Sequence, residues 1–173
     1  LPNQLLLNKA QFRGNVTGGT WHLEGSVGHI KVDGWLRDTM IATDGDVKSV
    51  QVGGLDHVDL LLDVKDGFDF EAITNATPTD DVFDSAATLR KLTVRGIRGE
   101  TGPMTIDSRI AAWHLGNVTL RDMEADNGGN LWGLTAVDLK SLRVPDEGYR
   151  WPNRNEVDGP DQPWFDDFRV RLV

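Results

Sequence analysis

The sequence of 173 residues contains no cysteine and only one tyrosine, and its 18 basic side chains are outnumbered by 27 acidic ones. The absence of cysteine excludes disulfides, thiolate catalysis and zinc sites built on thiolate ligands. The net charge of −9 argues against nucleic acid as the main partner, because phosphate binding requires a concentration of Lys and Arg. No apolar run approaches the roughly 20 residues that a membrane-spanning helix requires. We therefore expect an acidic protein without a transmembrane segment.

The sequence does contain enough apolar material for one folded domain, with 39% hydrophobic and 26% charged residues. We expect residues 1–173 to form that single domain. The first residues, LPNQLLLNKAQF, include neither an initiator methionine nor a signal-type apolar stretch. This start indicates a processed product or a piece of something longer, so adjoining domains of a longer chain are expected as partners.

One short pattern, apolar-x-x-apolar-x-apolar, occurs five times, and we call each copy a hexad. The last four residues of each hexad alternate between apolar and polar, which is the period-2 signature of a strand with one buried face. Turn residues follow most copies closely, and a second apolar segment comes after the turn. The hexads are VGHIKV at 27–32, VKSVQV at 47–52, LRKLTV at 89–94, LGNVTL at 115–120 and LKSLRV at 139–144.

The spacing of the hexads predicts the fold. The intervals between successive copies are similar, except that the interval between the second and third copies is close to twice the others. A strand, a turn and a second strand within roughly 20–26 residues match one coil of a parallel β-helix, and a single coil cannot bury its own apolar side. We predict an all-β fold, a short right-handed single-stranded parallel β-helix (solenoid), with the apolar hexad residues pointing inward. The alternative is an antiparallel β-sandwich, which does not require the hexad to return at this interval.

The hexads also divide the chain into regular and irregular parts. Because the ends of a stack expose sheet edges and interior apolar surface, a cap is expected at an end. The expected parts are an N-terminal coil or edge at 1–24, regular coils at 25–64, an inserted loop at 65–88, regular coils at 89–144, and a Pro- and Trp-rich C-terminal cap with a final strand at 145–173.

Two glycine-bounded segments carry a resemblance to a class of known proteins. GSVGHIKVDG at 25–34 and GDVKSVQVGG at 45–54 resemble the coils of bacterial extracellular parallel β-helix repeat proteins of the adhesin and autotransporter-passenger type. The resemblance implies an extracellular or cell-surface location and a structural or adhesive role as a segment of a larger secreted protein. The expected partner is a polysaccharide or a protein surface. Fold alone does not imply an activity, so these remain expectations.

The polar positions of the hexads contain basic residues and no acid, although acids predominate in the chain. If the hexads stack, these side chains form a basic strip on one face. Lysine on an exposed sheet discourages aggregation, and a basic strip also suits an anionic polysaccharide or an acidic partner. The predicted ligand-binding residues are Lys31, Lys48, Arg90, Lys91, Lys140 and Arg143.

Other functions rest on acidic residues. Asp107 and Arg109 are predicted to lie on the same side of one strand, where they would be the catalytic pair of a polysaccharide-acting lyase or hydrolase. No HExxH, GxSxG, GxGxxG or P-loop motif supports an enzyme, and a self-assembling filament is a further alternative.

Asp46 and Asp66 are separated by the same interval as the first two hexads, so consecutive coils could stack them. The possible calcium ligands are Asp46, Asp66, Asp69 and Glu71.

Overall fold

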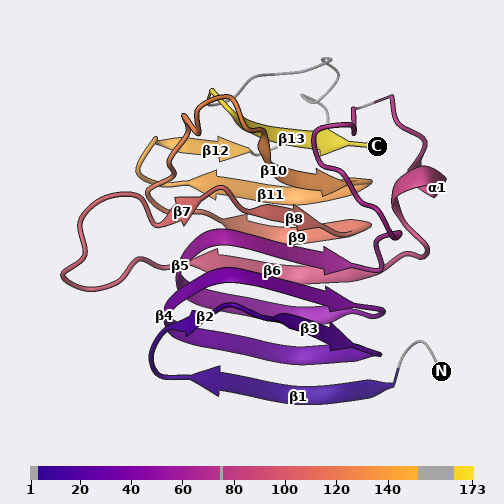
Figure 1. Ribbon diagram of the computed structural model, residues 1–173, viewed down its shortest axis with the longest axis horizontal. Coiled ribbons are helices and arrows are strands. Elements are labelled where there is room, and N and C mark those ends of the chain that lie inside the picture. Colours follow the sequence, from indigo (N-terminus) through magenta and orange to yellow (C-terminus); the bar gives the residue numbers. More distant parts are fainter. Residues whose placement is uncertain (1–3, 75, 152–165) are drawn as a thin grey trace.

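The computed structural model describes residues 4–74, 76–151 and 166–173, and within them the protein is all-β (Figure 1). Its strands belong to one sheet, and its only helix there is a single turn. The elements are β1 Leu5–Phe12, β2 Val16–Thr17, β3 Thr20–Leu23, β4 Ser26–Thr43, β5 Val47–Leu62, α1 Thr79–Val82, β6 Thr88–Val94, β7 Thr105–Ile106, β8 Arg109–Ala111, β9 His114–Thr119, β10 Trp132–Ala136, β11 Asp138–Val144, β12 Tyr149–Trp151 and β13 Phe168–Leu172.

The sheet is curled, so that two rows of strands enclose one apolar core. The long strands β4 and β5 run through both rows. Their first parts pair with β1 and β6, and their second parts pair with β2, β3, β7 and β8. The first row continues through β9 and β11, and the second row continues through β10 and β13. Figure 1 shows the strands stacked between β1 at one end and β12 and β13 at the other.

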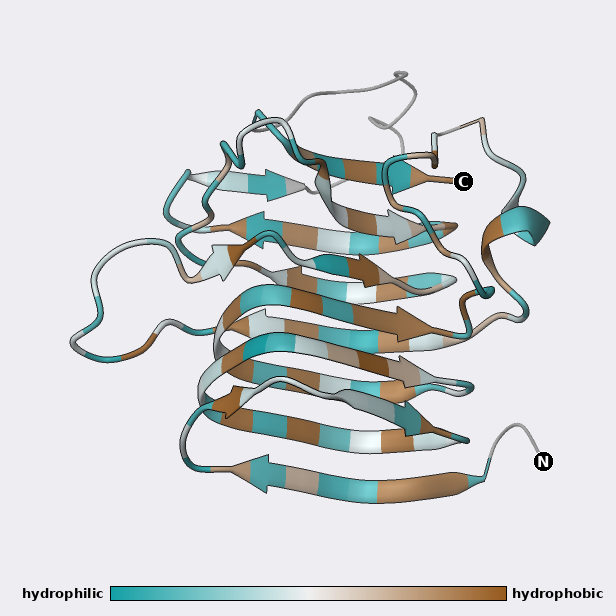
Figure 2. Ribbon diagram, viewed as in Figure 1, coloured by the Kyte–Doolittle hydropathy of each residue, from teal (hydrophilic) through white to brown (hydrophobic). Residues whose placement is uncertain are grey.

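The hexads lie side by side in the first row and run parallel to one another. Val47 pairs with Val27 on one side and with Leu89 on the other, and Leu115 pairs with Leu89 and Leu139. The alternation of apolar and polar residues along the strands is visible in Figure 2. Every apolar hexad residue is at most 3% exposed, which confirms the predicted core: Val27, Ile30, Val32, Val47, Val50, Val52, Leu89, Leu92, Val94, Leu115, Val118, Leu120, Leu139, Leu142 and Val144.

One strand pair departs from the parallel pattern. β12 runs antiparallel to β11, with Arg150 opposite Arg143, so the sheet is mixed and the expectation of a purely parallel sheet was wrong here. The reversal follows from the turn after β11, in which the Gly148 N–H donates to the Pro145 carbonyl at 3.1 Å. Gly148 has φ +63, a value that glycine adopts without steric cost. The parallel pairing of neighbouring hexads equally differs from an antiparallel sandwich.

Segments between the strands leave the two rows at several points. The segment between β5 and β6 carries α1 and buries Phe83 and Ile73 in a second apolar cluster with Ala111. The Phe83 ring also contacts Trp113, at 6.0 Å between centroids. The expected inserted loop at 65–88 therefore packs against the sheet. Residues 152–165 of the expected C-terminal cap lie outside the described residues.

Candidate functional site

A bend occurs at the same place in three neighbouring segments of the second row, namely β4, β5 and the segment that joins β7 to β8. Asp38, His57 and Asp107 occupy this bend with φ values of +48, +52 and +32. The registers on either side place them next to one another, because Thr39 pairs with Val58 and Asp59 pairs with Arg109. We call Asp38, His57 and Asp107 the bend column. Positive φ is uncommon outside glycine, and Asp and His are among the residues that adopt it most readily.

Hydroxyl groups next to the bend column satisfy the backbone groups that the bend frees. Thr39 donates to the Arg37 carbonyl at 2.6 Å, and Ser108 donates to the Ile106 carbonyl at 2.7 Å. Ser108 also accepts a hydrogen bond from the Val58 N–H at 3.2 Å, which joins β5 to the segment before β8. Buried backbone groups need such partners, so the hydroxyls stabilise the bend.

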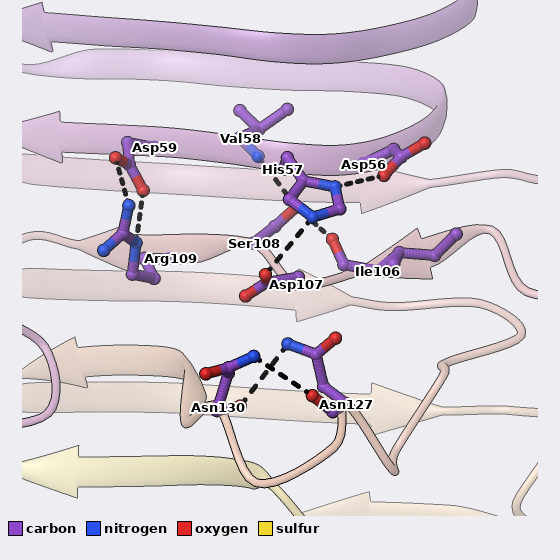
Figure 3. A network of polar contacts seen from close by, with 10 residues as sticks. All are labelled: Asp56, His57, Val58, Asp59, Ile106, Asp107, Ser108, Arg109, Asn127 and Asn130. Carbon is purple, nitrogen blue, oxygen red and sulfur yellow. Dashed lines mark hydrogen bonds and ion pairs between the residues drawn. The ribbon is translucent and has the colours of Figure 1, made fainter.

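His57 is the centre of a network of charged groups (Figure 3). Its Nδ1 lies 2.6 Å from Asp56 Oδ1, and its Nε2 lies 3.4 Å from Asp107 Oδ2. The hydrogen bond to Asp56 raises the pKa of His57 above its ordinary value, and the negative charges of Asp107, Asp56 and Asp38 act in the same direction. Partial burial opposes the shift. The imidazolium form is therefore favoured first by Asp56, the preceding residue on β5, and then by Asp107 and Asp38 from the neighbouring segments of the second row.

The other carboxylates of the network also have cationic partners. Arg109 donates to both oxygens of Asp59, at 2.6 and 2.7 Å, and this forked geometry is the strongest form of such a pair. Arg37 Nε lies 3.0 Å from Asp56 Oδ2, and its guanidinium stacks 4.2 Å above the Trp35 ring centroid. The two ion pairs connect β5 with its neighbours β4 and β8, so they hold adjacent strands of the second row together.

This geometry corrects the expectation of an Asp107–Arg109 pair. Asp107 lies outside β8, at the bend, so the alternation of side chains along a strand does not apply to it. Each of the two residues interacts with the neighbouring strand β5 instead, Asp107 with His57 and Arg109 with Asp59. The forked contact pairs the charge of Asp59 with that of Arg109.

A groove of about 550 Å³ lies beside the network, between the outer face of the second row and the segment that follows β5. Asp59 and Arg109 form part of its floor together with Met40, and Asp66 and Phe68 line its other side. The remaining acidic lining residues are Asp44, Asp63 and Asp84.

The predicted calcium ligands do not come together as expected. Asp46 accepts a hydrogen bond from the Thr88 N–H at 2.8 Å, because β6 is the strand that follows β5 in the first row. The chain leaves the row after Leu62, so the expected stacking of Asp46 and Asp66 was wrong. Asp69 accepts from the Glu71 N–H at 3.0 Å, an ordinary turn contact. In residues 4–74, 76–151 and 166–173, no three His, Asp or Glu side chains are grouped closely enough to hold a metal ion.

The predicted basic residues lie on the strands of the first row, but they occupy different register positions and do not all lie beside one another. Lys48 lies beside Arg90, as the pairing of Val47 with Leu89 shows, whereas Lys91 pairs with Asn117. Lys31 differs from the others because it forms an ion pair with Asp33 at 3.0 Å, and this contact lowers the pKa of Asp33.

Arg150, which the hexad pattern does not include, adds to this surface by lying opposite Arg143. We call the exposed basic residues on β5, β6, β11 and β12 the basic face. Within the described part of the chain, none of them forms an ion pair. The basic face consists of Lys48, Arg90, Lys91, Lys140, Arg143 and Arg150.

Comparisons with known proteins identify no relative: no family model, no curated protein and no solved structure matches the chain. Among the described residues there is no helix with the length and apolar character to cross a membrane.

The His57 network predicts a specific dependence of stability on pH. A raised pKa in the folded state means that the protonated form stabilises the fold fully below about pH 6.5, and that this contribution is lost as pH rises through the folded-state pKa. His57→Gln should therefore lower the melting temperature on the order of 2 °C near pH 6 and by less near pH 9. The effect is small because the side chain is 56% exposed.

Thermal unfolding of both proteins across this pH range checks the prediction. His29→Gln is the matched control, because His29 contacts the hydroxyl of Ser49 at 2.8 Å instead of a carboxylate. If His57→Gln lowered the melting temperature equally near pH 6 and near pH 9, the result would contradict the proposed role of the imidazolium.

Proposed function

We propose that the protein is a structural or adhesive module, folded as a short right-handed parallel β-helix within a larger secreted or cell-surface bacterial protein. The parallel pairing of neighbouring hexads supports this proposal, and so does the pairing of Val27 with Val47, because both are the first residues of consecutive hexads. Stacked coils of this kind present long, regular outer surfaces that suit contact with extended partners.

We propose further that the basic face contacts an anionic polysaccharide, and one observation carries this step. In a chain of net charge −9, the basic face remains exposed and without ion pairs in the described residues, while acids such as Asp59 have basic partners elsewhere. Arg143 and Arg150 lie directly opposite each other, and like charges in that position destabilise a sheet. A bound polyanion removes that repulsion.

A double charge reversal tests the proposal. Lys91→Glu combined with Lys140→Glu should weaken binding to dextran sulfate or polygalacturonate by roughly tenfold or more. Binding should also weaken as salt rises, because exposed charges are screened beyond about 8 Å at physiological ionic strength. Biolayer interferometry or isothermal titration at several salt concentrations measures both effects.

The matched control is Lys65→Glu combined with Arg98→Glu, which changes the net charge equally at positions outside the first row. We expect this control to keep the wild-type affinity within about twofold. Absence of binding to either polymer at low salt would refute the proposal. Equal weakening in both double variants would also refute it, because net charge alone would then account for the binding.

A further inference from the structure

The end of the sheet formed by β1 exposes large apolar side chains of the kind that are buried elsewhere in the protein. The large apolar side chains that are most exposed in the described residues, Leu5 at 56% and Leu6 at 53%, lie on this strand, and Phe12 is 37% exposed. Only one other large apolar side chain in the same residues, Met40, is exposed to a similar degree. Three of the four exposed large apolar side chains in the described residues therefore lie on one edge strand, and such a strand marks a surface for interaction.

The backbone at this end is equally open. Within the described residues β1, β2 and β3 pair with β4 alone, so their other edges carry unpaired N–H and C=O groups. β1 is eight residues long, and a long apolar edge strand is a ready template for a further strand. This edge is visible at the bottom of Figure 1.

The apolar residues that pair from strand to strand in the first row continue into β1 and end there. Leu7 pairs with Val27, and Phe12 pairs with Val32 and contacts the Trp21 ring at 5.5 Å. Leu7 and Trp21 are only partly buried, whereas Val27 is 2% exposed, because the end coil has a neighbour on one side only.

The opposite end of the first row is different. There β12, three residues long, runs antiparallel to β11 and occupies the edge that a further parallel strand would use. Short edge strands of this kind limit the addition of further strands. A second copy of this chain therefore cannot extend the parallel first row by placing its β11 against β1.

We infer that the β1 end docks a further β-coil that carries the apolar-x-x-apolar-x-apolar hexad, with its first strand parallel to β1. Apolar residues at the hexad positions would cover Leu7, Ala10 and Phe12, which continue the columns of Val27, Ile30 and Val32. The backbone of the added strand would pair with the open edge. This inference does not depend on polysaccharide binding, which concerns the basic face.

Adding a coil by fusion tests the inference. In the first fusion, a copy of residues 25–44 replaces residues 1–4. The first residue of the added hexad then precedes Leu7 by the same number of residues as Leu7 precedes its partner Val27. Hydrogen exchange of the β1 amides should slow by roughly tenfold or more, and the melting temperature should rise by several degrees. A second fusion with a copy of residues 45–64 should give the same result, so that the test does not depend on one sequence.

The control is the first fusion with the apolar residues of its hexad copy, Val27, Ile30 and Val32, changed to serine. Equal protection of β1 in the fusion and in this control would overturn the inference, as would the failure of both hexad-bearing fusions to fold. Sedimentation of the unfused protein supplies the remaining test. A dimer whose β1 amides are already protected would mean that a second copy occupies this edge, and would also overturn it.

Discussion

Gly116→Ala is expected to destabilise the protein by about 3 kcal/mol. A Cβ at this position would lie 2.1 Å from the Arg90 carbonyl oxygen and 2.7 Å from its carbon. These are backbone atoms of the neighbouring strand β6, so β6 and β9 would have to separate at the centre of the first row. Forcing atoms into a packed site typically costs about 1–3 kcal/mol, and lost strand hydrogen bonds add to this.

Gly14→Ala is the matched control, because a Cβ at Gly14 would meet nothing within 4 Å. We expect this variant to match the wild type within about 0.5 kcal/mol. Urea denaturation of both variants, followed by circular dichroism, measures the difference in the free energy of unfolding. Equal midpoints for Gly116→Ala and the wild type would contradict the close approach of β6 and β9.

Leu92→Ala is expected to cost about 2–5 kcal/mol, because it leaves a cavity in the core. Leu92 is fully buried and lies between Val50 of β5 and Val118 of β9. Its neighbours in the column belong to paired strands on both sides, so the surrounding structure has little freedom to collapse into the space.

Lys91→Ala provides the comparison, since Lys91 is the preceding residue on the same strand and is exposed. It should change the free energy of unfolding by no more than about 0.5 kcal/mol. The same denaturation experiment serves for both variants. A similar decrease in the free energy of unfolding for Lys91→Ala and Leu92→Ala would contradict the assignment of inner and outer positions in the hexad.

The hexad positions could be predicted because strand alternation is a local property. Side chains point to opposite sides in turn, so the apolar residues of VKSVQV and LRKLTV mark their own buried face. The same repetition indicated that hexads lie beside one another. The basic residues at the polar positions followed from this pattern, apart from Arg150, whose place opposite Arg143 depends on the turn after β11.

The ion pairs between strands of the second row could not be predicted from the local pattern. His57 and Asp107 are distant in the sequence, and they meet only because the segment between β5 and β6 leaves the sheet and the column resumes beyond it. The expected neighbour of Asp46 was Asp66, one hexad interval further along the chain, but the resumed column gives it Thr88. A constant interval between hexads does not predict neighbours where an inserted segment separates two adjacent strands of the sheet.

The sequence by itself therefore determined the all-β character, the inward-facing hexad residues and the exposure of the basic residues, since each depends on the alternation within a few neighbouring residues. Only the tertiary structure decided which strands are neighbours in the second row, and with that the Asp59–Arg109 ion pair, the surroundings of His57 and the open edge of β1. Contacts between neighbouring strands depend on how many residues separate those strands in the sequence, and that number varies along the molecule without altering the local pattern.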